Sequence, residues 1–141
     1  MARTFGLAAQ LQFTYILDIE APVGKNAPNR RDDVTLVQYL LAVWMAHEKD
    51  LAKLTPLLLV TPPMQVDGSF GDITRKGIEA FEIFHQPVVN RDGRIDPTFQ
   101  TVATRKMFLL NQILFFAGGL RGGVPQTRIP FPASIRPLLY R

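Results

Sequence analysis

The chain has 141 residues, of which 47% are hydrophobic and 20% charged, so we expect a packed core and exclude an intrinsically disordered chain. It contains no cysteine, which excludes disulfide bonds, thiolate nucleophiles and cysteine-ligated zinc sites. The net charge of +4 is uneven, because six basic residues and no acidic one lie from Arg105 onward, against ten basic and twelve acidic residues before it. No apolar run reaches the ~20 residues of a membrane-spanning helix, so we expect no membrane span.

Residues 1–32 are predicted to form an extension that contains one β-strand. Residues 12–23 alternate between apolar and polar side chains, which indicates a half-buried strand, and the Pro, Gly and Asn residues of 21–31 indicate a loop. We expect the C-terminal arm or another subunit to pair with this strand. Gln10 and Gln12 interrupt the apolar run near the start, so we expect synthesis in the cytoplasm without a signal peptide.

A helical domain is predicted over residues 33–117, beginning with a helix from Val34. We expect Asp32 or Asp33 to cap this helix and Trp44 to lie in the core. The residues along its inner edge are Val34, Val37, Leu40, Leu41, Trp44 and Glu48. Residues 45–65 are apolar and interrupted by prolines, which predicts an inserted, bent loop.

Two short turns of one kind are the strongest local signal in the chain. They occupy residues 67–71, with the sequence DGSFG, and residues 92–96, with the sequence DGRID. An Asp-Gly pair favours a tight turn because Asp bonds its own backbone and Gly accepts a positive φ. An apolar residue follows each glycine by two positions and is expected to point inward. The signature residues of the two turns are Asp67, Gly68, Phe70, Gly71, Asp92 and Gly93.

The stretch between these turns is predicted to be an amphipathic helix. We expect Gly71 to adopt a second left-handed conformation, with Asp72 or Thr74 as the N-cap. Glu79 and Glu82 fall on the polar face, where pairs with neighbouring basic residues would be worth ~0.2–0.5 kcal/mol each. The apolar face consists of Ile73, Gly77, Ile78, Phe81 and Phe84, and the basic residues near the two glutamates are Arg75 and Lys76.

The last helix is predicted to run from Pro97, with Asp96 as its cap, to about Ala117. Its second half is apolar on nearly every side, so extra elements or another chain must cover it. Residues 118–141 contain four prolines and four of the basic residues, which predicts an extended basic arm. This arm could be solvated, or it could dock on an acidic protein surface or an anionic polymer.

Taken together, these motifs resemble the peptidoglycan-binding-like domain of bacterial cell-wall enzymes. The resemblance covers about residues 33–105 and rests on DGSFGDIT, on Ala80-Phe81 at the end of the central helix, and on the second Asp-Gly turn. Val37–Leu41 is similar to the opening helix of the family, whereas Glu82 stands where the family usually has Gln. The resemblance implies a mainly α fold with a three-helix core, to which this chain adds an N-terminal β-strand and an extended C-terminal arm.

Candidate contacts follow from the expected surface of this core. We expect a groove between the first two helices and the turns. Its candidate ligand-binding residues are Arg75, Gln86, Asn90, Arg91 and Arg94. The candidate partner interface consists of Phe108, Leu109, Phe115, Phe116, Arg121, Arg128, Phe131, Arg136 and Tyr140.

The sequence contains little that indicates catalysis. The two histidines, His47 and His85, form no metal-binding pattern; we expect a structural role for His85 at the end of its helix and a surface position for His47. The Asp92 turn lacks two of the oxygen ligands of a calcium loop. The catalytic groups of the resembling family lie in a separate domain. We therefore expect no enzymatic activity, no metal and no cofactor.

The expected function is that of a non-catalytic subunit in a larger assembly, such as a phage tail, a contractile injection apparatus or a secretion apparatus, in a phage particle or at the cell envelope. The alternative is a stand-alone protein that binds peptidoglycan and targets a partner enzyme to the wall. Nucleic-acid binding is disfavoured, because the arginines are scattered and no DNA-binding motif accompanies them.

Overall fold

The computed structural model describes residues 3–6, 15–47, 64–97, 105–117, 120–121, 124–125 and 132–134. This part of the chain is mainly helical, with three helices and a short β-hairpin near the N-terminus, which confirms the predicted fold class. The helices are α1 (Arg31–His47), α3 (Asp72–His85) and α4 (Lys106–Ala117), and a 3-10 turn, η2, covers Val88–Asn90. Much of the predicted insertion and arm lies outside the described residues, as does Glu48.

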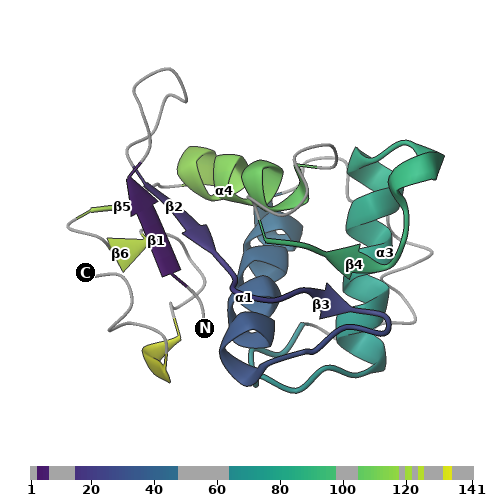
Figure 1. Ribbon diagram of the computed structural model, residues 1–141. Helices are drawn as coiled ribbons and strands as arrows, with labels where there is room; N and C mark the ends of the chain where they lie inside the picture. Colours follow the sequence, from purple (N-terminus) through teal and green to yellow (C-terminus); the bar gives the residue numbers. More distant parts are fainter. Residues whose placement is uncertain are drawn as a thin grey trace.

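Helix α1 runs through the middle of the molecule, with α3 along one side and α4 across one end (Figure 1). It is buried on nearly every side, as a helix surrounded by other elements must be. Trp44 is 1% exposed and meets the ring of Phe81 edge to face, with the centroids 5.4 Å apart. The prediction that Trp44 belongs to the core is confirmed.

The first helix begins at Arg31, so the predicted start at Val34 is wrong, and neither Asp32 nor Asp33 is its cap. The buried carboxylate of Asp33 instead accepts hydrogen bonds from the backbone N–H groups of Glu20 and Ala21, at 3.1 and 3.2 Å. Asp33 therefore fastens the preceding loop to the first turn of α1.

Helix α3 packs closely on α1 at Gly77. A Cβ atom at this position would lie in ordinary contact distance, 3.5 Å, of Cδ1 of Leu41, and the terminal methyl group of Met64 would have to move aside. Ile78 and Phe81 are fully buried, which confirms the predicted apolar face. Glu82 is also buried, so its predicted place on the polar face is wrong.

The N-terminal strand pairs within its own chain. Strand β1 (Arg3–Gly6) lies antiparallel to β2 (Tyr15–Asp18), with Thr4 opposite Leu17. The expected partner, the C-terminal arm or another subunit, is therefore wrong for this strand. On its helix side, Leu17 exchanges two hydrogen bonds with the side chain of Asn111 of α4: its N–H donates to Oδ1 at 2.6 Å, and its C=O accepts from Nδ2 at 2.8 Å. The side chain of Asn111 thus gives Leu17 the pair of hydrogen bonds that a residue in a neighbouring strand would give it.

Two further pairs of short strands complete the described part. Strands β3 (Val23–Gly24) and β4 (Arg94–Ile95) pair antiparallel and join the loop after β2 to the second turn. Strands β5 (Leu120–Arg121) and β6 (Val124–Pro125) form a small hairpin within the arm that was predicted to be extended.

The last helix starts later than predicted. Pro97 is buried and not helical, and α4 begins at Lys106, directly after Arg105 in a left-handed conformation with φ of 51°. A left-handed residue cannot continue a right-handed helix, which explains why α4 begins there. Among the described residues, no helix has the length and apolar character to cross a membrane.

Replacing Asn111 by Leu should destabilise the protein by about 2–4 kcal/mol, because two buried backbone groups of Leu17 would lose their partners. The half-buried Gln112, next along the same helix, provides the control Gln112→Leu. The free energy of unfolding of both variants is measured by urea denaturation. Equal stabilities for the two variants would contradict the role given to Asn111.

Candidate functional site

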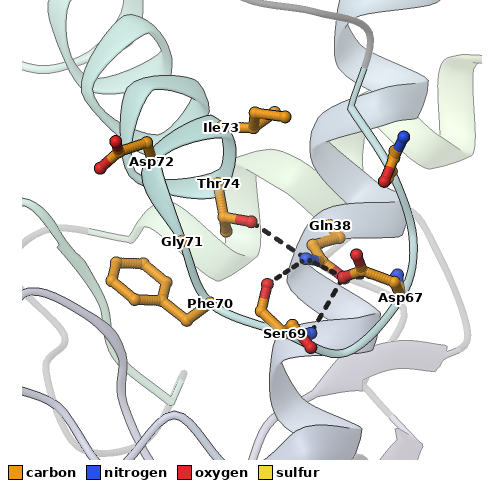
Figure 2. Close-up of a pocket in the computed structure, with 9 residues that line it drawn as sticks. Gln38, Asp67, Ser69, Phe70, Gly71, Asp72, Ile73 and Thr74 are labelled. Atoms are coloured by element: carbon orange, nitrogen blue, oxygen red, sulfur yellow. Dashed lines mark hydrogen bonds between the residues drawn. The ribbon is translucent and has the colours of Figure 1, made fainter.

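The first Asp-Gly turn is held by one side chain from α1. Gln38 is 1% exposed, and its Oε1 accepts hydrogen bonds from the backbone N–H groups of Asp67 and Gly68, at 3.0 and 2.8 Å. Its Nε2 lies 3.1 Å from Oδ1 of Asp67, 3.0 Å from the carbonyl oxygen of Ser69 and 3.0 Å from Oγ1 of Thr74 (Figure 2). Every hydrogen-bonding position of this buried amide is therefore used within the turn and the start of α3.

The conformation of the turn confirms one predicted glycine role and contradicts the other. Gly68 has a φ of 79°, in the left-handed region, as expected of an Asp-Gly turn. Gly71 is extended, with φ of −152°, and it is the N-cap of α3 without any side-chain cap. The prediction that Asp72 or Thr74 caps the helix is thus wrong. The hydroxyl oxygen of Thr74 is buried and accepts a hydrogen bond from Nε2 of Gln38.

The carboxylate of Asp67 is stabilised in its ionised form. Hydrogen bonds from the backbone N–H of Ser69 and from the Gln38 side chain hold the pKa of Asp67 below its ordinary value. The turn therefore keeps a fixed negative charge at its surface at neutral pH.

A pocket of about 330 Å³ opens beside this turn, between α1 and the start of α3 (Figure 2). It lies where the sequence predicted a groove. Its lining combines short polar side chains, two carboxylates and two apolar groups: Gln38, Gln65, Asp67, Ser69, Phe70, Gly71, Asp72, Ile73 and Thr74. Phe70 is half-buried and packs against the core, whereas the Asp72 carboxylate is exposed. None of the five predicted ligand-binding residues lines this pocket.

The second turn is held by an ion cluster in which Lys106 and Glu82 are buried and Asp92 is half exposed. Lys106 of α4 is 1% exposed, and its Nζ donates hydrogen bonds to Oε2 of Glu82 at 2.6 Å, to Oδ1 of Asp92 at 2.8 Å and to the carbonyl oxygen of Arg94 at 2.8 Å. Both carboxylate oxygens of Glu82 accept from the N–H of Gly93, at 3.0 and 3.1 Å. Lys106, counted in the sequence with the basic C-terminal quarter, thus belongs to the core.

The pKa values of the two carboxylates in this cluster are shifted in opposite directions. Burial raises the pKa of Glu82 above its ordinary value, and the hydrogen bonds from Lys106 and Gly93 offset only part of that effect. Burial also raises the pKa of Asp92, but hydrogen bonds from Lys106 and from the backbone of Arg94 outweigh it, so the net pKa is lowered. Glu82 is therefore the carboxylate of the cluster that takes up a proton more readily.

Three of the five predicted ligand-binding residues come together at the end of α3. Nδ2 of Asn90 donates to Oε1 of Gln86 at 3.4 Å, and Nε of Arg91 donates to the carbonyl oxygen of Gln86 at 2.9 Å. Gln86 is only 6% exposed, so the expectation that it is a surface contact is wrong. Arg75 lies at the other end of α3 and pairs with Glu79 at 3.0 Å, as predicted. Gln86, Asn90 and Arg91 therefore bond to one another at the C-terminal end of α3, far along the helix from Arg75.

An exposed aliphatic corner was missed by the sequence analysis. Ile83 is 48% exposed, Val88 75% and Val89 89%, and the three lie at the end of α3 and in η2. The available signal was the pair of consecutive valines after Pro87. A pair is too short to show a hydrophobic periodicity, so the sequence did not indicate whether these side chains are buried or exposed. We call Ile83, Val88 and Val89 the aliphatic corner.

The predicted partner interface is only partly within the described residues. Phe108 and Leu109 are half-buried on α4, and Leu109 packs against the core. Phe115 and Phe116 lie in α4 and Arg121 in β5. Arg128, Phe131, Arg136 and Tyr140 lie outside the described residues.

His85 packs against the aromatic rings of Trp44 and Phe84, with centroids 5.8 and 4.9 Å apart. The described residues contain no group of three or more histidine, aspartate or glutamate side chains that could hold a metal ion.

No protein-family model matches this sequence, and neither a characterised protein nor a solved structure shows significant similarity to it.

The two glycines of the first turn give a matched test of the turn geometry. Gly68→Ala should cost about 2–4 kcal/mol, because its left-handed φ disfavours a side chain and its Cβ would lie 2.8 Å from Cγ of Arg31 and 2.9 Å from Oγ1 of Thr35. Gly71→Ala should cost less than about 1 kcal/mol, because its backbone is extended and nothing lies within 4 Å of a new Cβ. Thermal and urea denaturation measure both costs; equal losses, or a larger loss for Gly71→Ala, would contradict this geometry.

Proposed function

We propose that this chain is a non-catalytic, peptidoglycan-binding-like module that acts as a structural or interaction subunit of a larger assembly. The proposal rests on two Asp-Gly turns that flank one amphipathic helix, with left-handed glycines at Gly68 and Gly93. It is also supported by the core position of the opening helix motif, Val37–Leu41, which is buried against the other two helices. A phage tail, a contractile injection apparatus or a secretion apparatus is the kind of assembly that such a subunit would serve.

The aliphatic corner is the observation that carries the assembly proposal. Neighbouring exposed apolar side chains, such as those of Val88 and Val89, are a feature of protein–protein contact surfaces. Val88 and Val89 are exposed on a short turn that is bonded back to the end of α3: Nε of Arg91 donates to the carbonyl oxygen of Gln86 at 2.9 Å, and Nδ2 of Asn90 donates to Oε1 of Gln86 at 3.4 Å. A rigid apolar projection loses little conformational entropy when it docks on a partner, which favours binding.

Site-specific photocrosslinking of the full chain tests this proposal. A photoreactive phenylalanine analogue replaces Val89 in cells that naturally produce the protein, and the same analogue at the exposed Arg30, at the start of α1, is the control. We expect a discrete crosslinked protein adduct from position 89 and none from position 30. The absence of an adduct at position 89, or identical adducts from both positions, would contradict the assembly proposal.

The pocket beside the first turn favours a second candidate function, binding to the bacterial cell wall. It offers carboxylates, an amide and a hydroxyl group beside an aromatic ring, and this combination suits the hydroxyl and amide groups of a glycan or a peptide. This function could operate within the assembly or in a stand-alone protein.

A pull-down with purified peptidoglycan sacculi tests the second candidate. The variant Asp72→Lys places a long cation at the pocket edge, and Glu79→Lys makes the same charge change outside the pocket; in the native chain both carboxylates pair with Arg75. We expect retention of the native chain and of Glu79→Lys, with at least a several-fold loss for Asp72→Lys. Failure of the native chain to bind sacculi would remove this candidate, while equal retention of all three would exclude the pocket as the site.

A further inference from the structure

The ion cluster at the second turn contains one cation and two anions. The side chains of Lys106 and Glu82 are 1% and 2% exposed, whereas that of Asp92, which joins them from the turn at 2.8 Å, is 49% exposed. With all three groups ionised, the cluster carries a net charge of −1, and Glu82 is the carboxylate that is shielded from water. Burial of an uncompensated charge is unfavourable, so a proton added to one carboxylate would relieve it.

In the described part of the chain, Lys106 is the cation that forms an ion pair with Glu82. Lys106 faces it from α4, and Asp92 faces it from the turn and repels it. Arg94 of β4 directs its guanidinium group to Asp96, at 3.9 Å, and gives the cluster only its carbonyl oxygen.

Two charged or titratable neighbours on α3 and one residue after β3 complete these surroundings. On α3, Glu79 pairs with Arg75, and the ring of His85 lies against Phe81 and Phe84. After β3, Lys25 is exposed and approaches Gly93 with its backbone and the start of its side chain. The Glu82 carboxylate bonds to Lys106 and Gly93 and to none of these neighbours among the described residues, so they do not offset the second negative charge of the cluster.

We propose that Glu82 and Asp92 form a shared proton-binding site that fastens α3, the second turn and α4 together more tightly as the pH falls from neutral to mildly acidic. The added proton resides on Glu82, whose carboxylate lies beside that of Asp92 because both contact Nζ of Lys106, at 2.6 and 2.8 Å. Protonated Glu82 donates to the Asp92 carboxylate while Asp92 continues to neutralise Lys106. The cluster then has no net charge, and each charged group keeps a partner.

The direction of the pH effect follows from linkage. The pKa of Glu82 is raised in the folded state above the ordinary 4.5, so the folded protein holds a proton that the unfolded chain has released. This contribution to stability is fully present below pH 4.5 and is lost as the pH rises through the folded-state pKa. The lowered pKa values of Asp67 and Asp92 act oppositely, and their contributions are lost only as the pH falls below the ordinary 3.8. An ordinary salt bridge would give the reverse trend between pH 4.5 and neutrality.

Urea denaturation of the full chain between pH 4.5 and 8 tests the proposal. The native protein should show a higher denaturation midpoint as the pH falls through this range. Glu82→Gln, which imitates the protonated carboxyl group, should lose this dependence and should be at least as stable as the native protein at pH 8. The control Glu79→Gln, which alters the surface pair with Arg75, should keep the native trend. A native trend retained in Glu82→Gln, or a native midpoint that falls with pH, would overturn the proposal.

A second measurement needs no variant. The carboxyl carbon of Glu82 is followed by NMR during a pH titration of the native protein, and its inflection should lie above 4.5, with a response transmitted to the carboxyl carbon of Asp92. An inflection at or below 4.5 would overturn the proposal even if Glu82→Gln failed to fold.

Discussion

The left-handed glycine of each Asp-Gly turn points its backbone N–H towards the core, and the structure depends on a buried side-chain oxygen that accepts it. Gln38 of α1 provides this oxygen for Gly68, and Glu82 of α3 provides it for Gly93. A buried N–H without an acceptor would cost about 1–3 kcal/mol. The two turns are thus not independent loops, because each is bonded to a helix that precedes it in the chain.

The same two contacts determine how the helices are joined. Gln38 also reaches Thr74 in the first turn of α3, so one amide connects α1, the first turn and α3. Glu82 reaches Lys106, so one carboxylate connects α3, the second turn and α4. The described surface includes the pocket beside the first turn and the aliphatic corner near the second turn. These are the two surfaces that the proposed functions would use. Both are held on turns whose backbone is fixed by the core, which suits a binding module.

Much of the fold follows from local sequence patterns, whereas the charged core does not. The helical spacing of Ile78 and Phe81 and the Asp-Gly pairs are local signals, and the helix face and left-handed glycines they predicted are present. The ion pair between Glu82 and Lys106 joins residues 24 positions apart, and no local period records such a contact. A helical wheel places Glu82 beside polar neighbours, so only the tertiary structure reveals its burial.

The candidate site shows the same division. The position of a groove beside the first turn was predicted from the turn and the two helices, but its lining residues were not. The ligand-binding residues were predicted from the polar positions expected at the surface. This criterion included Gln86, which is buried, and omitted Gln38, which the sequence shows only as part of a helix motif. The role of Asn111 was missed for a similar reason, because the position of an amide in an apolar helix does not show which strand it bonds to.

Hydrogen exchange of the two glycine amides, followed by NMR on the native protein, tests this account most directly. If buried oxygens of Gln38 and Glu82 accept these N–H groups, Gly68 and Gly93 should exchange as slowly as interior amides of α1, although both lie in turns. Exchange of either glycine at the rate of an exposed loop amide would show that its turn is not held by the core, and would contradict the account.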